Sequence, residues 1–556
     1  LVTGALLVPN SITPIYASEN NFVKWSKLIG STGGTSASLA YSDTVSHVET
    51  LIDGNLLVAG TFDGNKVTGN DKLKGKSDGY IAKYSTTGEE IFSTLIGGNN
   101  AEVLNYAIAS NHGGYVAVGY TQSNDQDFDT LLKGGKDGFV VKLDEEGKIE
   151  KSVTFGGTDA DEFKMILNDL DGGYIAVGYT HSTNGDLENI KDTTDRDAVI
   201  VKYDQDLNIQ WTTTVGGSQG SKMDEFNSVV RTDDGYFAVG YANSNGDDLE
   251  GIHLGKKDIL VVKFDESGKK LWVKTYGGSL DDTANIVLNT ARNNEDSGRA
   301  RIVQEEDVKD QGLIIAGSTA STDGTFTSKE NEGTNSFILR LDYNGNVIFE
   351  DTLASTASNK AIGLKVVEDG FVLSGTYSSN DLDFTGQDLN GKQNAYVSYY
   401  SKTGNRLNMN SFGGNNSDDV LGIERAANED YIVYGKTTSN DGFATGLQGK
   451  VDGFIASVDG DQVLSYTTEK YLVPVKAIKA KEDSASMMAP MLYEKAYVEK
   501  EGNQYLVTFY FQNATIMGST VSSKTLGAVS YDDHGTLVPA LYDEYDEKTQ
   551  IKTTQI

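Results

Sequence analysis

Residues 171–180 read DGGYIAVGYT, and closely similar wording stands at 113–121 (GGYVAVGYT) and at 234–242 (DGYFAVGYA). A catalytic motif normally occurs once in a chain, whereas a phrase that recurs at a near-constant interval is typical of a stacked structural unit. Aligning the chain on the glycine of this phrase finds seven copies, at Gly60, Gly119, Gly178, Gly240, Gly317, Gly375 and Gly435. The pattern therefore predicts seven repeated units.

Each unit reads as four short strands. In the third unit, EFKMILN, YIAVGYT, AVIVKYD and IQWTTTV are rich in β-branched and aromatic residues, and turn-forming segments separate them. Four strands per unit without a helical period predict an all-β fold, a seven-bladed β-propeller of four-stranded blades over residues 18–468. The alternation of bulky and small residues in YIAVGYT suggests a close approach of the backbone where neighbouring sheets pack face to face.

A second marker keeps the same register. An Asp or Asn precedes the third strand of every unit, at Asp78, Asp137, Asp197, Asp258, Asn335, Asn394 and Asp452. Because Asp and Asn side chains satisfy nearby backbone amides, this series is predicted to cap turns.

The fourth-strand type occurs eight times, from VKWSKLI (23–29) to VLSYT (463–467), although there are seven units. A ring loses its weakest edge if the first strand completes the last sheet. We therefore expect 23–29 to close the ring and 463–467 to lead into the next module.

Composition excludes several classes of function. The chain has 556 residues, 47 Lys plus Arg and 80 Asp plus Glu, a net charge of −33 that would repel nucleic acid and anionic membranes. It has no Cys, and its five His show no HExxH spacing, so disulfides, thiol nucleophiles and a zinc-hydrolase motif are excluded.

The opening residues 1–17 read as the back half of a secretory signal peptide, with a buried strand as the alternative. No later stretch reaches the roughly 18 apolar residues of a membrane span. These features predict an extracellular protein, secreted or attached to the cell surface.

Three strings look like functional motifs but favour simpler interpretations. GGSQG (216–220) fits the GxSxG pattern of a hydrolase elbow, yet no helix is expected after it, so Ser218 is assigned to a turn. GSTVSSKT (518–525) lacks the second glycine of a phosphate-binding loop. The alternate carboxylates of 125–129 lack the Gly and the distant Glu of a calcium loop, which favours a solvated acidic loop over weak calcium binding. No catalytic residue or metal ligand is assigned, and we expect the chain not to be an enzyme.

Over roughly 24–468 the sequence resembles the long-unit propeller repeats of many bacterial secreted and surface proteins. The resemblance rests on FGGTDADEF, DGGYIAVGYTHS and GGKDGFVVKLDEEG. It implies the fold and says little about activity, because such propellers mostly supply binding surfaces and scaffolds.

Residues 469–556 differ in character and hold four of the seven Met. The segments YLVPVKAIKA, SASMMAPML, AYVEKEGNQYLVTFYF and GAVSYDDHG resemble a near-iron-transporter (NEAT) domain, a β-sandwich with which Gram-positive bacteria capture haem. The resemblance implies a small C-terminal β-sandwich in which Ser486, Met488 and Met491 form a lip over haem, since thioethers suit a flat apolar ring and a hydroxyl can reach a propionate. The family's iron ligand is a Tyr in a Tyr-x-x-x-Tyr hairpin, whereas Tyr542 and Tyr545 have a different spacing. A plain hydrophobic core is the alternative for the Met cluster.

Three functions stay open at this point. The first is haem capture for iron acquisition, with haem or a haemoprotein as the partner and the propeller as a scaffold. The second is an adhesin or scaffold that binds a host or surface protein or a glycan and has no role in haem binding. The third, a propeller glycosidase, would need paired carboxylates that converge on the central channel.

Overall fold

The computed structural model describes residues 22–30, 42–63, 73–190, 195–220, 223–252, 255–291, 311–327, 333–447 and 449–465, followed by separate strands between residues 469 and 555. The chain divides into two compact units. The main unit ends at Leu464, and the second contains Ser465–Ile556.

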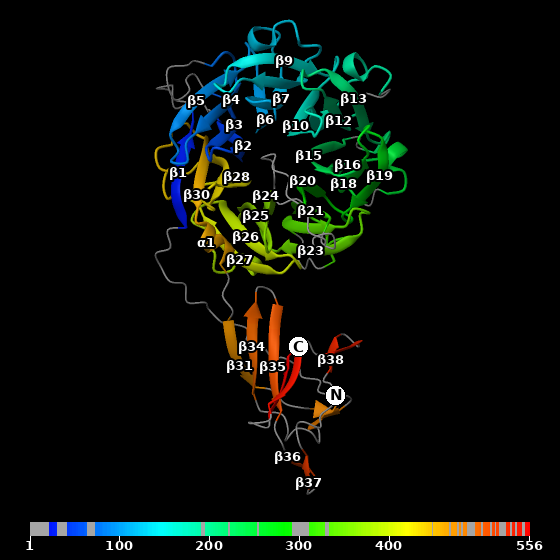
Figure 1. Cartoon of the computed structure of the whole chain (residues 1–556), viewed down its shortest axis with the longest axis vertical. Coiled ribbons are helices and arrows are strands. Elements are labelled where there is room, and N and C mark those ends of the chain that lie inside the picture. The colour runs from blue at the N-terminus through cyan, green and yellow to red at the C-terminus, as the bar shows by residue number, and fades with distance from the viewer. Residues whose placement is uncertain are drawn as a thin grey trace. The chain divides into compact units, whose positions relative to one another are not determined.

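The main unit is a ring of seven antiparallel four-stranded sheets within the described residues (Figure 1). The first three blades are β2 (Thr44–Thr50), β3 (Leu56–Phe62), β4 (Asp78–Tyr84) and β5 (Glu90–Ile96); β6 (Glu102–Ala109), β7 (Tyr115–Thr121), β8 (Asp137–Leu143) and β9 (Ile149–Phe155); and β10 (Asp161–Asn168), β11 (Tyr174–Thr180), β12 (Asp197–Tyr203) and β13 (Ile209–Val215). The fourth and fifth are β15 (Glu225–Thr232), β16 (Gly235–Ala242), β18 (Asp258–Phe264) and β19 (Lys270–Tyr276); and β20 (Asp282–Asn289), β21 (Leu313–Thr319), β22 (Asn335–Leu341) and β23 (Val347–Leu353). The sixth is β24 (Asn359–Val367), β25 (Gly370–Tyr377), β26 (Asn394–Ser401) and β27 (Arg406–Phe412), and the seventh contains β28 (Asp418–Arg425), β29 (Tyr431–Thr437) and β30 (Asp452–Val458). The predicted seven-bladed β-propeller is confirmed.

The first strand of the chain closes the ring. Strand β1 (Val23–Ile29) pairs antiparallel with β30 and completes the seventh blade, as the sequence predicts. The expectation of a further strand at 463–467 is wrong where the structure describes it, because helix α1 occupies Gly460–Leu464. Asp459 accepts a hydrogen bond from the Gln462 amide at 3.1 Å, which favours a helical turn at this point.

One backbone hydrogen bond recurs at every junction between neighbouring blades. The donor is the backbone amide of the first residue of an inner strand or of the residue just before it. The acceptor is the carbonyl of the residue immediately before the third strand of the preceding blade. These bonds are Glu102 to Ser77, Asp161 to Lys136, Asp224 to Arg196, Asp282 to Lys257, Asn359 to Thr334, Asp418 to Gln393 and Asp43 to Val451, at 2.8–3.0 Å. The blades are therefore joined by the same short main-chain contact around the ring.

The glycine of the repeated phrase is required by a β-bulge. In the third blade the pairing of β10 with β11 shifts between Phe163 and Met165, and a Cβ at Gly178 would lie 1.9 Å from the carbonyl oxygen of Glu162. The predicted close approach is confirmed, but it occurs within one sheet. The suggestion that a neighbouring sheet causes it is wrong, because the bulge brings the inner strand of the same blade against the glycine.

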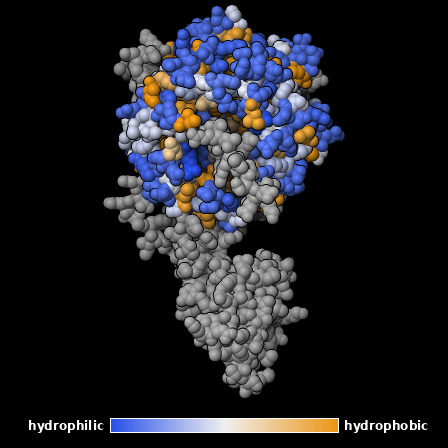
Figure 2. Space-filling model, viewed as in Figure 1, coloured by the Kyte–Doolittle hydropathy of each residue, from blue (hydrophilic) through white to orange (hydrophobic). Residues whose placement is uncertain are grey.

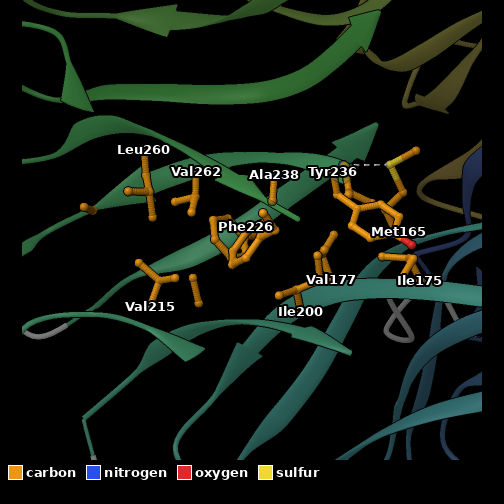
Figure 3. Close-up of a cluster of buried hydrophobic side chains, with 14 of the residues drawn as sticks. Met165, Ile175, Val177, Ile200, Val215, Phe226, Tyr236, Ala238, Leu260 and Val262 are labelled. Carbon is orange, nitrogen blue, oxygen red and sulfur yellow. Dashed lines mark hydrogen bonds between the residues drawn. The ribbon is translucent and has the colours of Figure 1, made fainter. Parts of the chain in front are cut away.

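The core lies between the faces of adjacent blades. Figure 3 shows Phe226 of β15 among Val177 of β11, Ile200 of β12 and Ala238 of β16, so this cluster joins the third and fourth blades. Phe226 is fully buried. Replacement of such a side chain by Ala typically costs about 3–5 kcal/mol.

Asp78, Asp137, Asp258 and Asp452 each begin a third strand and accept a backbone amide of the preceding turn, as predicted, whereas the side-chain amide of Asn394 donates to the Asp388 carbonyl. Asp137 accepts the Lys133 amide at 2.6 Å and the Gly134 amide at 3.1 Å, and Asp78 accepts the Lys74 amide.

The second unit contains a five-stranded antiparallel sheet of order β31 (Glu469–Pro474), β34 (Lys495–Glu501), β35 (Gln504–Phe511), β41 (Ile551–Gln555) and β40 (Tyr542–Asp546). Two-stranded hairpins are formed by β32 (Ile478–Lys479) with β33 (Glu482–Ala485), β36 (Ala514–Ile516) with β37 (Ser519–Val521), and β38 (Ser530–Asp533) with β39 (Thr536–Pro539). Strands β34 and β35 form a hairpin in which Glu501 pairs with Gln504.

Candidate binding site in the central channel

The inner strands β2, β6, β10, β15, β20, β24 and β28 surround the centre of the ring (Figure 1). Each carries a β-bulge at the same register, and the residues at this position are Ser46, Asn105, Lys164, Asn227, Asn285, Ile362 and Leu421. All seven line a cavity of about 920 Å³. The repeated bulge therefore places one side chain per blade on the channel wall.

Three of these bulge residues are Asn, and each connects its blade to the next one. The side-chain amide of Asn105 donates to the carbonyl of Phe163 at 2.7 Å. Asn227 and Asn285 make the equivalent bonds to Ala284 at 2.9 Å and to Ala361 at 2.8 Å. These amides are held in fixed orientations on the cavity wall.

In the third blade the bulge residue is Lys164, which pairs with Glu162 at 2.7 Å. Glu162 also accepts Lys136 at 2.6 Å. Burial alone would raise the pKa of Glu162, but the charges of Lys164 and Lys136 lower it to about 2. The ammonium group of Lys164 is therefore held in an ion pair with a carboxylate of its own strand.

The cavity wall has an apolar side. Ile108, Leu167, Val230 and Leu288 occupy the position three residues after the bulge in four consecutive blades, and all line the cavity. In the sixth blade this position holds Lys365, which also lines the cavity and forms a largely buried ion pair with Glu424 of the seventh blade. The wall is therefore apolar along one arc and charged along another.

His47 lies on the wall next to the charged arc. Its ring stacks on Tyr106 with centroids 3.5 Å apart, and its Nδ1 lies 2.8 Å from the carbonyl oxygen of Ala107. Burial and the charge of Lys365 lower the pKa of His47 to about 3. The imidazole is therefore neutral near pH 7, and donation by Nδ1 leaves Nε2 as an acceptor.

A buried acid lies where the wall meets the turn after β10. Asp169 forms ion pairs with Lys202 and Arg231 and accepts a hydrogen bond from Tyr236 at 2.6 Å. Burial and the bond to Asp169 raise the pKa of Tyr236 well above its usual range. Asp169 is the one buried carboxylate among the described lining residues; Asp233, Asp234 and Glu368 are exposed.

This arrangement offers oriented amides, a neutral imidazole, an apolar arc and ion-paired charges. Such a surface can contact a ligand that has both hydrophobic and polar parts. On the face shown in Figure 2, hydrophilic residues cover most of the blades, and hydrophobic residues show in patches among them.

The structure accounts for two of the motif-like strings. Ser218 is exposed and is followed by the short strand β14 (Gln219–Gly220), so the helix of a hydrolase elbow is absent at this described site. Asp125 accepts the amide of Asn99 at 2.9 Å and Asp127 accepts that of Gly97 at 2.9 Å. The acidic loop therefore caps residues 97–99, which lie between β5 of the first blade and β6 of the second.

Other predicted sites lie outside the described residues. These are Ser486, Met488 and Met491 of the expected haem lip and the signal-like residues 1–17. Within the described part of the chain, no group of three or more His, Asp or Glu is arranged to hold a metal ion. No helix in that part is long and apolar enough to cross a membrane.

Sequence reasoning missed the cavity residues. The repetition of Asn in EVLN, EFN and DTAN, at 105, 227 and 285, is a signal that alignment of the units could have found. The glycine of the repeated phrase lies opposite the bulge in each blade, but which inner-strand residue turns toward the channel depends on the pairing of the two strands.

Comparisons with known proteins leave the family open. No protein-family model matches the chain, and no curated protein matches it. Solved structures with similar shapes include Drosophila Plexin A in complex with Semaphorin 1b, with a TM-score of 0.38 and 8% identity over 78% of this chain and 88% of that one. The parainfluenza virus 5 hemagglutinin-neuraminidase ectodomain gives 0.33 and 7% over 78% and 84%.

A eukaryotic initiation factor gives a TM-score of 0.29 and 11% identity over 66% of this chain, which spans 65% of that factor's length. The propeller is identified by its own sheet topology.

Proposed function

We propose that this chain is an extracellular binding protein whose propeller is a platform for a protein or glycan partner and whose C-terminal unit captures haem. The observation that carries the binding role is the cavity of about 920 Å³, whose wall combines oriented amides with an apolar arc. Propellers supply such surfaces without any requirement for catalysis. A binding role also agrees with the ion pairs of Asp169, because they engage the one buried carboxylate among the described lining residues.

The haem role is supported by the ordered match of four segments in 469–556 to the NEAT pattern. Ser486, Met488 and Met491 supply a hydroxyl and two thioethers, which suit contact with the ring and a propionate. Tyr542 and Tyr545 do not fit the ligand pair of that pattern. They are three residues apart, whereas the pattern has a Tyr-x-x-x-Tyr spacing.

Haem titration of the full chain tests this part of the proposal. Because Tyr542 and Tyr545 do not fit the ligand pair, we expect weak haem binding through the lip, seen as a change in the Soret band, and we expect the double variant Met488→Ala/Met491→Ala to weaken it at least tenfold. Met517→Ala is the matched control, because it removes a Met of the same unit outside the expected lip. Equal titration curves for the double variant and the unmodified chain would overturn the haem role.

The platform role has a separate test. Leu167 is half-buried on the cavity wall, and Leu167→Trp would fill part of the cavity. Leu280→Trp is the control on an exposed loop residue outside the cavity lining. A glycan or protein array should show partners that bind the unmodified chain and the control but not Leu167→Trp. Partners that bind all three equally would place recognition away from the channel and overturn the channel assignment.

A further inference from the structure

The junctions between blades contain paired acidic or amide side chains. One member is the residue that begins a third strand, and the other is the residue at the start of the next blade's inner strand. The pairs are Asp78 with Glu102, Asp137 with Asp161, Asp197 with Asp224, Asp258 with Asp282, Asn335 with Asn359, Asn394 with Asp418 and Asp452 with Asp43. Every one of these residues is buried or nearly so. Five of the seven pairs consist of two carboxyl groups.

The pair at the first junction shows how close these groups come. Asp78 and Glu102 are fully buried, and a Cβ at Gly97 would lie 2.3 Å from Asp78 Oδ1 and 2.9 Å from Glu102 Oε2. The two carboxyl groups therefore converge over Gly97. This convergence explains why a residue without a side chain is needed at Gly97.

The donors around this pair satisfy three of its four oxygens. Glu102 accepts Thr121 Oγ1 at 2.8 Å and the Gly98 amide at 2.8 Å, and Asp78 Oδ2 accepts the Lys74 amide. Asp78 Oδ1 is buried and has no hydrogen-bond donor among the described residues. Two buried carboxylates that face each other would repel strongly, and a buried acceptor without a donor is costly.

The junction between the fifth and sixth blades shows what the missing donor is. There the pair is Asn335 with Asn359, and the Asn359 amide donates to Asn335 Oδ1 at 3.2 Å. An amide N–H bridges the two side chains at this junction. At the acidic junctions the equivalent bridge requires a hydrogen on one carboxyl oxygen.

We propose that the buried acid pairs at the blade junctions are proton-binding sites, in which one protonated carboxyl donates its O–H to the carboxylate of the neighbouring blade. No bond other than this hydrogen bond forms, and the proton comes from solvent when the blades assemble. We call each of these hydrogen-bonded side-chain pairs between neighbouring blades a clasp. The acid pairs are clasps that titrate, whereas the Asn335 and Asn359 pair is a clasp that does not.

The charged surroundings of two pairs agree with this assignment. The groups facing Asp78 are Glu102 and Lys74, and those facing Asp137 are Asp161 and Lys133. Lys74 and Lys133 direct their ammonium groups to Asp127 and Asp186 of the acidic loops, so each lysine already has a carboxylate partner.

Burial, followed by the neighbouring carboxyl group, raises the pKa of Asp78 and of Asp137 to about 6, despite amide hydrogen bonds that lower it. Because this folded-state pKa lies above the ordinary value of 3.8, the folded state binds the proton that the unfolded state has released. The stability from each clasp is fully present below about pH 4 and is lost as the pH rises through 6.

Asp137→Asn in the full chain tests the proposal, because the new side-chain amide would carry its own N–H, as Asn359 does opposite Asn335. Urea unfolding of the unmodified chain and of the variant is compared at pH 5 and pH 8. In the unmodified chain, the pair of Asp137 should lower the folding equilibrium constant about tenfold between pH 5 and pH 8. The variant should lack this tenfold decrease. Asp159→Asn, an exposed Asp in the adjacent loop, should leave the ratio unchanged.

Infrared difference spectra give a direct readout of the same proton. A band of a buried protonated carboxyl group should be present at pH 5, fall by pH 8 and decrease in Asp137→Asn. If Asp137→Asn is too unstable, Asn335→Asp combined with Asn359→Asp should create a new clasp and add about a tenfold pH dependence. An unchanged band and an unchanged pH ratio in these variants would overturn the proposal. A stabilisation by millimolar Ca²⁺ at pH 8 that Asp137→Asn abolishes would also overturn it, since the pair would then hold a cation.

Discussion

The indole of Trp211 lies directly against Gly268, so that a Cβ at Gly268 would stand 2.4 Å from the ring atom Cε3. Trp211 belongs to the outer strand β13 of the third blade, and Gly268 to the turn between β18 and β19 of the fourth. The same relationship joins Trp25 to Gly88, Phe92 to Gly147 and Phe349 to Gly404. An outer-strand aromatic residue therefore covers the turn of the next blade at four junctions.

Gly268→Ala is expected to destabilise the propeller by about 2–4 kcal/mol. Gly268 has φ of +79°, which costs a non-glycine residue about 1 kcal/mol, and displacement of Trp211 adds about 1–3 kcal/mol. Gly251→Ala is the matched control, since Gly251 has φ of +74° and an added methyl group there would have no atom within 4 Å among the described residues. Chemical denaturation of both variants measures the difference, and equal losses would show that the Trp211 contact contributes nothing.

Removal of residues 1–30 is expected to lower stability by about 3 kcal/mol or more relative to removal of residues 1–21. The longer deletion removes β1, whose Ile29 is buried, and exposes the edge of β30. Thermal unfolding and size-exclusion chromatography compare the two proteins. A peptide of residues 22–30 should restore the lost stability when added to the longer deletion. Equal unfolding midpoints of the two deletions would contradict closure of the ring by β1.

Lys365→Met is expected to destabilise the chain by about 3 kcal/mol, because it leaves Glu424 without its cation in a largely buried site. The double variant Lys365→Met/Glu424→Leu should recover most of that loss. The control is Lys263→Met, whose partner Asp234 is 63% exposed, and it should cost less than about 1 kcal/mol. Additive effects of Lys365→Met and Glu424→Leu in denaturant unfolding would contradict a direct ion pair.

His47 is expected to titrate near pH 3, which NMR of the ring carbon-bound protons measures. Its folded-state pKa lies below the ordinary value of 6.5, so its contribution to stability is fully present above pH 6.5 and is lost as the pH falls toward 3. Lys365→Met should raise the pKa of His47, since it removes a nearby positive charge, whereas Lys263→Met should not change it. A His47 pKa near 6.5 in the unmodified chain would show that the ring is solvated.

Much of the fold follows from local pattern. Four strands in each of seven units can be predicted because alternating apolar residues and turn-forming residues repeat within a short segment, as in 161–215. Closure by β1 could also be predicted, since one strand more than the units require is present and an open edge is unfavourable. The helix at Gly460–Leu464 could not, because a strand-like run of five residues does not distinguish a strand from a helical turn.

By itself, the sequence determined the repeat number, the strand order within a blade and the positions of the glycines and turn-capping Asp residues. These features depend on residues close together in the chain. The tertiary structure alone decided the channel wall and the junction clasps. Asn105 and the carbonyl of Phe163 are 58 residues apart, and Asn335 and Asn359 are 24 apart. Such contacts depend on how one twisted sheet packs on the next and on where each bulge turns the strand, and both are set by the assembled ring.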